Sequence, residues 1–150
     1  MSRFSLLLKD VEPDVRAASL VSLKDFIKTI SIEKITSVLL PHLNVLITDS
    51  SPHVRAGLPM VVVEMARCIG KEQYVSKLSN MITEALKDDN SEVKQNFLQC
   101  LYPLATIIGV EMFNPQMVTA LTNLVKDPQW RIRLNVIEQI GSYVPTMVNY

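Results

Sequence analysis

The segment "KDPQWRIRLNVIEQI" (residues 126–140) decides the fold of this 150-residue chain, because it is the fourth copy of one pattern. Each copy has an aspartate and, six positions later, a basic residue that follows Val or Ile. The aspartates recur every 39 residues, and the pairs are Asp10 and Arg16, Asp49 and Arg55, Asp88 and Lys94, Asp127 and Arg133. An internal repeat with a period near 40 is typical of stacked helical pairs.

Apolar positions recur at the same offset, which extends the repeat beyond its charged residues. Two of these columns are Phe4, Leu43, Ile82, Leu121 and Leu23, Val62, Leu101, Ile140. Within residues 35–47 the apolar residues are spaced by three and four, as on one face of a helix. Pro52 suits the first position of a second helix, and Gly70 suits its end. Each unit is therefore predicted to contain two helices.

The predicted fold is all-α, a single α-solenoid of HEAT repeats with an armadillo-like α-α superhelix. The units are expected at about 1–31, 32–70, 71–109 and 110–150, and the first lacks most of its first helix. Four prolines are expected to bend helices, since an internal proline removes a backbone hydrogen bond; they are Pro41, Pro59, Pro103 and Pro145. At the incomplete end, Phe4 and Leu8 are expected to be uncovered and to favour end-to-end contacts.

Composition excludes several classes of function. Fifteen basic residues balance fifteen acidic ones, so the chain lacks the basic surplus of a nucleic-acid binder. No apolar run is long enough for a membrane span or a signal peptide. Cys68 and Cys100 lie on apolar helix faces and are interpreted as core residues, which fits a reducing compartment. A cytoplasmic location is expected, with the nucleus as a second option.

No converging set of catalytic residues is found in the sequence. His42 and His53 lie in different parts of the second unit, without a partner pattern such as His-Glu-x-x-His. No glycine-rich phosphate loop or nucleophile elbow is present. The chain is therefore predicted to be no enzyme, with no cofactor, no metal and no small-molecule substrate.

The repeated charges are interpreted as a structural ladder. Positions six residues apart on a helix do not share a face, so each aspartate belongs to the turn and each base to the second helix. The turn carboxylate can accept from N–H groups at the start of that helix. An arginine can bridge its own aspartate and that of the adjoining unit. Lys94 cannot make the forked contact, so its rung is predicted to be weaker.

The same four segments resemble the scaffold, or A, subunit of protein phosphatase 2A, a family of HEAT repeats of near-constant length. Asp-x-x-Trp-Arg-x-Arg-Leu, from Asp127 to Leu134, is the most specific part of the likeness. The resemblance implies a non-catalytic scaffold that holds the phosphatase catalytic subunit and a regulatory B-type subunit through its intra-repeat turns. It implies a partner-binding role for Trp130 and Arg131. A tubulin-binding HEAT array or a transport adaptor remains the alternative.

Two interpretations of Trp130 remain open. In the first, the indole packs on a neighbouring turn. In the second, it anchors a partner, an interpretation favoured by the enrichment of Trp and Arg at binding hot spots.

Overall fold

The computed structural model describes the backbone of residues 2–148 and the side chains of residues 3–109 and 111–142. Within this part of the chain every regular element is helical. The α-helices are α1 (Ser2–Leu7), α2 (Pro13–Phe26), α3 (Ile32–Lys34), α4 (Leu40–Leu46), α5 (Pro52–Lys77), α6 (Ser79–Ala85), α7 (Ser91–Ile108), α8 (Pro115–Leu124) and α9 (Trp130–Val148). Short 3-10 turns at Ile27–Thr29 and Val110–Met112, and a π-helical turn at Ile35–Leu39, complete the set.

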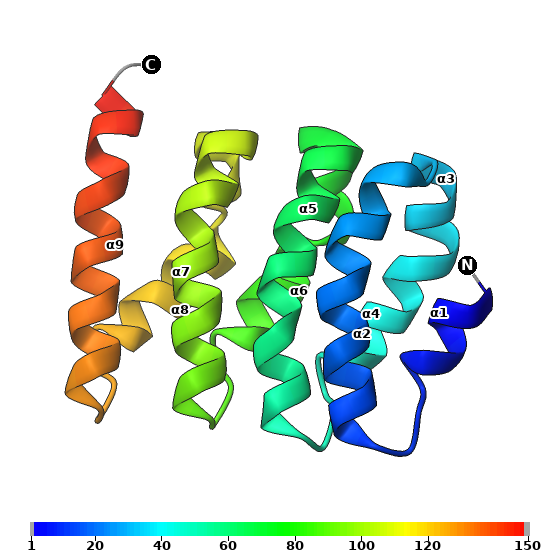
Figure 1. Cartoon of the computed structure of the whole chain (residues 1–150). Coiled ribbons are helices and arrows are strands. Elements are labelled where there is room, and N and C mark those ends of the chain that lie inside the picture. The colour runs from blue at the N-terminus through cyan, green and yellow to red at the C-terminus, as the bar shows by residue number, and fades with distance from the viewer. Residues whose placement is uncertain (1, 149–150) are drawn as a thin grey trace.

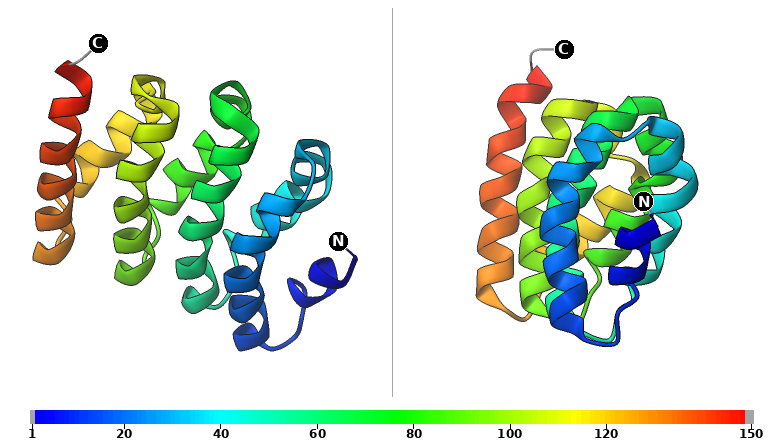
Figure 2. Two further views of the ribbon diagram at one scale, coloured as in Figure 1. Left: turned by 45° about the horizontal axis from the view of Figure 1, so that its top comes forward. Right: turned by 45° about the vertical axis from the view of Figure 1, so that its right-hand side comes forward.

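The helices form two rows. Helices α2, α5, α7 and α9 stand side by side, with α1, α4, α6 and α8 behind them (Figure 1). The two further views show the same two rows from other sides (Figure 2). Helices α2, α5, α7 and α9 make most of the contacts between neighbouring units. The prediction of an all-α solenoid is confirmed.

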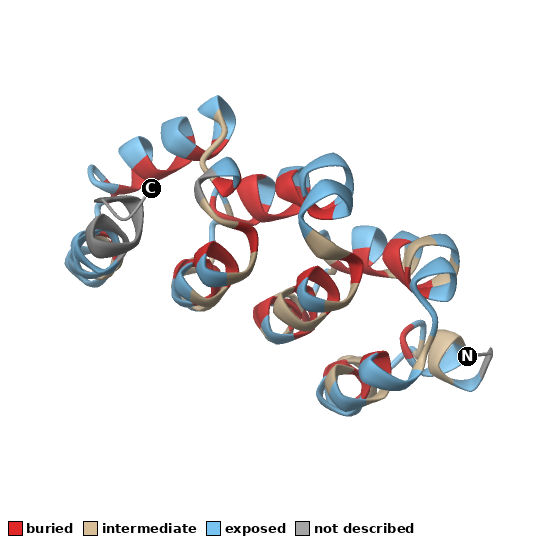
Figure 3. Ribbon diagram, turned by 90° about the horizontal axis from the view of Figure 1, so that it is seen from above, coloured by how far each residue is buried: buried red, intermediate tan, exposed pale blue. Residues whose placement is uncertain are grey.

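The core lies between the two rows, and the repeated apolar columns build it (Figure 3). Leu23, Val62 and Leu101 are fully buried in successive second helices. Leu43 and Ile82 are likewise buried in the first helices. Full burial of one such side chain stabilises the fold by about 1.5–3 kcal/mol, so a column that recurs in each unit stabilises the whole stack.

Local signals fix where the helices begin and end. Asn90 caps α7 by accepting from the N–H groups of Glu92 and Val93, and Asn114 caps α8 by accepting from Met117. Gly70 (φ 77°) and Gly109 (φ 85°) have the left-handed backbone conformation that favours glycine. Gly70 therefore breaks α5 at the place where the second unit is expected to end, although helix resumes directly after it.

The expectation of an uncovered N-terminal end was wrong for its two named residues. Leu8 is only 2% exposed, and Phe4 is partly buried because its ring stacks on Phe26 with centroids 4.7 Å apart. Phe4 lies on the short helix α1 and packs against Phe26 of α2, and Leu8 directly follows α1 and belongs to the buried core. Leu6 and Leu7 are the exposed apolar residues of α1.

The four prolines differ in their local settings. Pro59 and Pro103 lie inside α5 and α7 as expected. Pro41 instead lies at the start of α4, directly after the π-helical turn, whose wider hydrogen bonding accommodates the missing N–H. Pro145 lies within α9, outside the residues whose side chains are described. Among the described helices none is long and apolar enough to cross a membrane.

Candidate functional site: the intra-repeat turns

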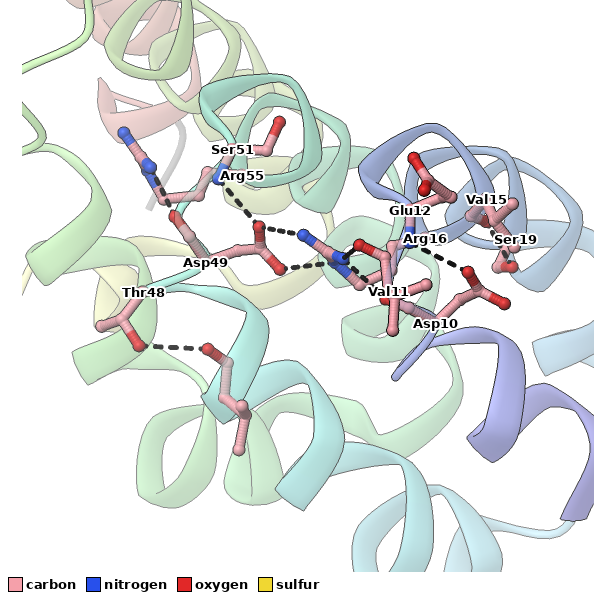
Figure 4. A network of polar contacts seen from close by, with 11 residues as sticks. Asp10, Val11, Glu12, Val15, Arg16, Ser19, Thr48, Asp49, Ser51 and Arg55 are labelled. Atoms are coloured by element: carbon pink, nitrogen blue, oxygen red, sulfur yellow. Dashed lines mark hydrogen bonds and ion pairs between the residues drawn. The ribbon is translucent and has the colours of Figure 1, made fainter.

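The first rung of the charge ladder joins the first two units. Arg16 donates from Nε and Nη2 to the two carboxylate oxygens of Asp49, both at 2.8 Å (Figure 4). Its Nη1 donates to the backbone carbonyls of Asp10, at 2.6 Å, and Val11, at 3.2 Å. The guanidinium therefore fixes its own turn with one nitrogen and the turn of the next unit with the other two.

The second rung repeats this geometry. Arg55 donates from Nε and Nη2 to Asp88 at 2.7 and 3.1 Å, and from Nη1 to the carbonyl of Asp49 at 2.5 Å. The side chains of this pair are 16% and 10% exposed. Water competes weakly with such a pair, and forked contacts to a charged acceptor are among the stronger hydrogen bonds.

The third rung, formed by Lys94 and Asp127, has fewer hydrogen bonds than the first two. Lys94 makes one contact to Asp127, from Nζ to Oδ2 at 2.5 Å, and among the described contacts it makes none to the carbonyl of Asp88. A lysine has a compact ammonium group without the arginine fork. The structure thus shows a single contact where the first two rungs have a forked one.

Arg133 lies beyond the last rung. Its Nη1 donates to the carbonyls of Asp127, at 2.8 Å, and Pro128, at 3.0 Å. Arg16 makes the same two backbone contacts in the first unit. No described residue accepts from Nε or Nη2 of Arg133, which in Arg16 and Arg55 reach the next unit.

Each ladder aspartate stabilises its own turn rather than capping the helix directly. Asp49 accepts from the N–H of Ser51 at 2.9 Å, and Asp88 accepts from that of Asn90 at 2.8 Å. Ser51 and Asn90 are themselves the residues that precede their helices. The predicted direct capping by aspartate is therefore corrected to a turn two residues upstream.

Charge and hydrogen bonding hold the ladder carboxylates ionised. Burial alone would raise the pKa of Asp88, but hydrogen bonds from Arg55 and the Asn90 N–H outweigh it. The charges of Arg55 and Lys94 act in the same direction, so the pKa lies below its ordinary value. Asp49 and Asp127 have lowered pKa values for the same reasons. These are the features of a structural ion pair, whose carboxylate is committed to its partner.

Trp130 and Arg131 are the first two residues of α9, directly after the fourth intra-repeat turn, and take no part in the ladder. Trp130 is the first residue of α9 and is 57% exposed. The guanidinium carbon of Arg131 lies 4.8 Å from the centroid of the indole, a cation–π contact. The pair therefore forms one exposed surface element, with an aromatic face and a positive charge.

The corresponding positions of the other turns lack this chemistry. Thirty-nine residues earlier stand Ser91 and Glu92, and before them Pro52 with His53 and Pro13 with Asp14. None of these combines an aromatic ring with a fixed positive charge. The exposed tryptophan thus distinguishes the fourth turn.

Other titratable groups do not converge on a site. His42 is partly buried and its pKa is lowered by burial and by the charge of Lys9. Cys100 is buried and Cys68 half-buried, and burial raises the pKa of both thiols. Among the described residues no group of three His, Cys, Asp or Glu side chains could hold a metal ion.

A groove across the second helices was missed by the reasoning from sequence. It has a volume of about 400 Å³ and crosses α2, α5 and α7. Asp14 and Glu92 line it together with small residues such as Ala18 and Gly57. No described lysine or arginine lines it. The 39-residue spacing of Ala18, Gly57 and Asn96 could have indicated this shared face.

The comparison with protein families identifies the chain. A family model described as PIK3R4-like, middle domain, matches residues 1–147. The chain belongs to the PIK3R4-like family. No curated protein matches the sequence. The family match does not support the resemblance to the phosphatase 2A scaffold, whereas the helical-repeat part of that prediction is confirmed.

Solved structures agree with the PIK3R4-like chain in fold. A designed armadillo-repeat protein in complex with the peptide (KR)4 has a TM-score of 0.62 at 19% identity. The match covers 94% of this chain and 63% of the designed protein. An engineered protein also has a TM-score of 0.62, at 14% identity, with 93% and 60% of the two chains covered. The PIK3R4-like chain thus spans less than two thirds of either protein.

Proposed function

We propose that this PIK3R4-like segment is a non-catalytic scaffold that holds protein partners through its intra-repeat turns. The observation that carries the proposal is the exposed Trp130–Arg131 pair at the fourth turn, beside the last rung of the ladder, in which Lys94 pairs with Asp127. The ion pairs of the ladder hold the turns in place, and a binding residue that is already held in place loses less entropy when a partner binds. The family description, a middle domain, fits a segment that works within a longer chain.

The proposed partner is a protein with an apolar pocket and a nearby carboxylate. The indole would fill the pocket and Arg131 would pair with the carboxylate, as Trp and Arg do at binding hot spots. We further propose a cytoplasmic or nuclear setting, without nucleic acid, membrane or small-molecule substrate.

The experiment is the paired substitution Trp130→Ala with Arg131→Ala in the full-length protein. The variant should keep its melting temperature and lose at least ~2 kcal/mol of partner binding, the usual hot-spot threshold. The matched control is Pro52→Ala with His53→Ala, which alters the corresponding positions of the second turn. A variant that melts early and binds normally would show that Trp130 is a packing residue.

The finer proposal is that the partners are the catalytic and regulatory B-type subunits of protein phosphatase 2A. It rests on the likeness of the four repeated segments, of which the stretch from Asp127 to Leu134 is the most specific part. Purified catalytic subunit should bind the full-length protein and lose affinity in the paired variant. Absence of binding would eliminate the phosphatase proposal and leave the general scaffold proposal standing.

A second candidate function is capture of an extended basic peptide in the groove across α2, α5 and α7. The observation that favours it is the pair of carboxylates, Asp14 and Glu92, in a groove lined by no described cation. The designed armadillo-repeat neighbour is described in complex with the basic peptide (KR)4. A labelled (KR)4 peptide should bind this chain and lose affinity in Asp14→Asn with Glu92→Gln. Equal affinity of the variant would refute this function.

A further inference from the structure

A basic notch, here called the lysine notch, lies where the turns of the third and fourth units meet. It has a volume of about 270 Å³ and is bounded by the start of α7 and the end of α8. Its charged lining residues are Lys87, Lys94, Lys126 and Asp127, and Asn123 adds an uncharged amide. The described lining therefore has two more positive than negative charges.

The equivalent notch between the second and third units has the opposite charge. It has a volume of about 360 Å³, and its lining residues stand 39 positions before those of the lysine notch. Three exchanges change the charge, since Thr48, Glu84 and Asp89 of this earlier notch correspond to Lys87, Asn123 and Pro128. The two notches thus share one backbone plan and differ in their side chains.

The lysine notch does not depend on where the sequence ends. Both of its walls lie within the chain, in two units that pack on each other. The earlier notch stays open although the fourth unit packs beyond it. There Lys87, the equivalent of Lys126, keeps 56% of its side chain exposed. A unit that followed the fourth one would therefore leave the lysine notch open.

Two of the three ammonium groups are available to a ligand. Lys94 is committed to Asp127 at 2.5 Å, and its side chain is only 12% exposed. Lys126 is exposed, and no described residue forms an ion pair with it. Lys87 contacts Glu84 at 2.6 Å, but both side chains are more than half exposed, and such surface pairs are weak. An anion can therefore bind Lys87 and Lys126 without breaking the ladder.

The chemistry of the lysine notch matches a phosphate monoester. Such a group carries about −1.5 to −2 charges at pH 7 and has three strong acceptor oxygens. Two ammonium groups balance this charge, and the amide of Asn123 can donate to a further oxygen. A carboxylate has one charge and two oxygens, so it matches the two lysines less well.

The surroundings favour a phosphate that is carried by a protein segment. Four carboxylates and two cations line the earlier notch, one unit away, so it repels the extended negative surface of a bilayer or a nucleic acid. The chain as a whole has no net charge. Pro128 of the lysine notch belongs to the same turn as Trp130 and Arg131. A partner held at that turn is therefore within reach of the notch.

We propose that the lysine notch binds the phosphate of a phosphorylated side chain in a protein partner. Lys87 and Lys126 pair with the phosphate oxygens, and Lys94 keeps its contact to Asp127. The inference rests on the scaffold function proposed above, because the phosphate is carried by a partner of the fourth turn. Phosphorylation of that partner then strengthens its binding to this turn.

Retention of peptides by the immobilised full-length protein tests the proposal. The probes are pools of random peptides with one central phosphoserine, phosphothreonine or phosphotyrosine, and the same pools after dephosphorylation. At least one phosphorylated pool should be retained above its dephosphorylated form. Lys87→Ala with Lys126→Ala should weaken this retention at least about tenfold, through loss of two charge-assisted contacts. Lys87→Arg with Lys126→Arg should keep most of it, because both charges remain.

The matched control is Lys9→Ala with Lys77→Ala, which also removes two exposed lysines. Lys9 is the equivalent of Lys126 in the first unit and lies outside the lysine notch. The control should retain the phosphorylated pool like the wild type. Urea unfolding of both alanine variants should give the wild-type midpoint, since exposed lysines contribute little to stability.

Two further probes identify the source of the phosphate. Inorganic phosphate should displace the retained peptides, because it has the same charged group. Vesicles of phosphatidylcholine with a phosphoinositide should bind the wild type and the Lys87→Ala, Lys126→Ala variant equally. Vesicle binding that requires these lysines, without retention of phosphopeptides, would assign the notch to a lipid and overturn the proposal.

Three other results would overturn the proposal. Equal retention of phosphorylated and dephosphorylated pools would show that the phosphate is not recognised. Equal loss in the control variant would show general electrostatic attraction. Phosphopeptide binding that is lost in Trp130→Ala with Arg131→Ala, and kept in Lys87→Ala with Lys126→Ala, would place the phosphate at Arg131 and leave the scaffold function standing. Retention that depends on the lysines, with partner binding that ignores Trp130, would instead refute only the role proposed for Trp130.

Discussion

Removal of the Asp88 carboxylate should destabilise the stack far more than removal of its neighbour Asp89. Asp88 accepts two hydrogen bonds from Arg55 and one from the N–H of Asn90. The Asp88 side chain is 10% exposed, whereas Asp89 is exposed and is not one of the aspartates that recur every 39 residues. The substitutions Asp88→Ala and Asp89→Ala are therefore a matched pair at adjacent positions.

The expected magnitude follows from these contacts. A hydrogen bond to a charged group contributes about 1.5–3 kcal/mol, but bonds that share one carboxylate do not add fully. An exposed ion pair contributes less than about 1 kcal/mol, whereas breaking a buried one costs about 3–5 kcal/mol. The Arg55 side chain is 16% exposed and has a second hydrogen bond, to the Asp49 carbonyl. In Asp88→Ala, water and this second bond therefore compensate in part for the lost carboxylate. We expect Asp88→Ala to cost about 2–4 kcal/mol.

Urea unfolding followed by circular dichroism measures this cost. Asp88→Ala should lower the midpoint concentration at an unchanged slope, which indicates a loss of stability alone. Asp89→Ala should cost under about 0.5 kcal/mol, as is usual for exposed sites. A double-mutant cycle with Arg55→Met should give a coupling of about 1–3 kcal/mol. Equal costs at the two aspartates, or no coupling, would refute a structural ladder.

Three further predictions concern the same residues and the thiols. The pKa of Asp88 is lowered by folding, so its contribution to the free energy of unfolding is complete above about pH 5 and is lost as pH falls through about 4 toward the folded pKa. The difference in stability between wild type and Asp88→Ala, measured by urea unfolding, should therefore shrink over that interval. A difference that widens would contradict the ion pair. Lys94→Arg should add about 0.5–1 kcal/mol by restoring the fork and the carbonyl bond, and a lower urea midpoint would show that the third rung has no room for it. In the native chain a thiol reagent should modify half-buried Cys68 faster than buried Cys100; mass spectrometry showing equal rates would indicate frequent opening of the core.

The repeat pattern predicted the fold because it depends only on the spacing of residues along the chain. Columns such as Leu23, Val62 and Leu101 keep their spacing, and each unit buries them in the same way. The pairing of Arg16 with Asp49 also follows from this register. The spacing therefore predicted both the stacked helical architecture and the ladder of ion pairs.

Contacts that depend on three-dimensional detail were not predictable. The stacking of Phe4 on Phe26 requires the direction of a short helix, which no period in the sequence gives. The groove beside Asp14 and Glu92 is created by small residues on three different helices. The exposure of Trp130 could not be decided from sequence, because an indole at a turn is equally suited to packing and to binding.

Site-specific photo-crosslinking at the fourth turn tests the central claim of a partner-binding scaffold most directly. A photoreactive residue at Gln129, beside Trp130, is compared in the full-length protein with one at Glu12, the equivalent exposed position of the first turn. A partner should crosslink from position 129 and not from position 12. The crosslink should disappear in the Trp130→Ala, Arg131→Ala background, and the purified partner should bind directly. Equal crosslinking from both turns, or a crosslink that survives the double substitution, would contradict the account.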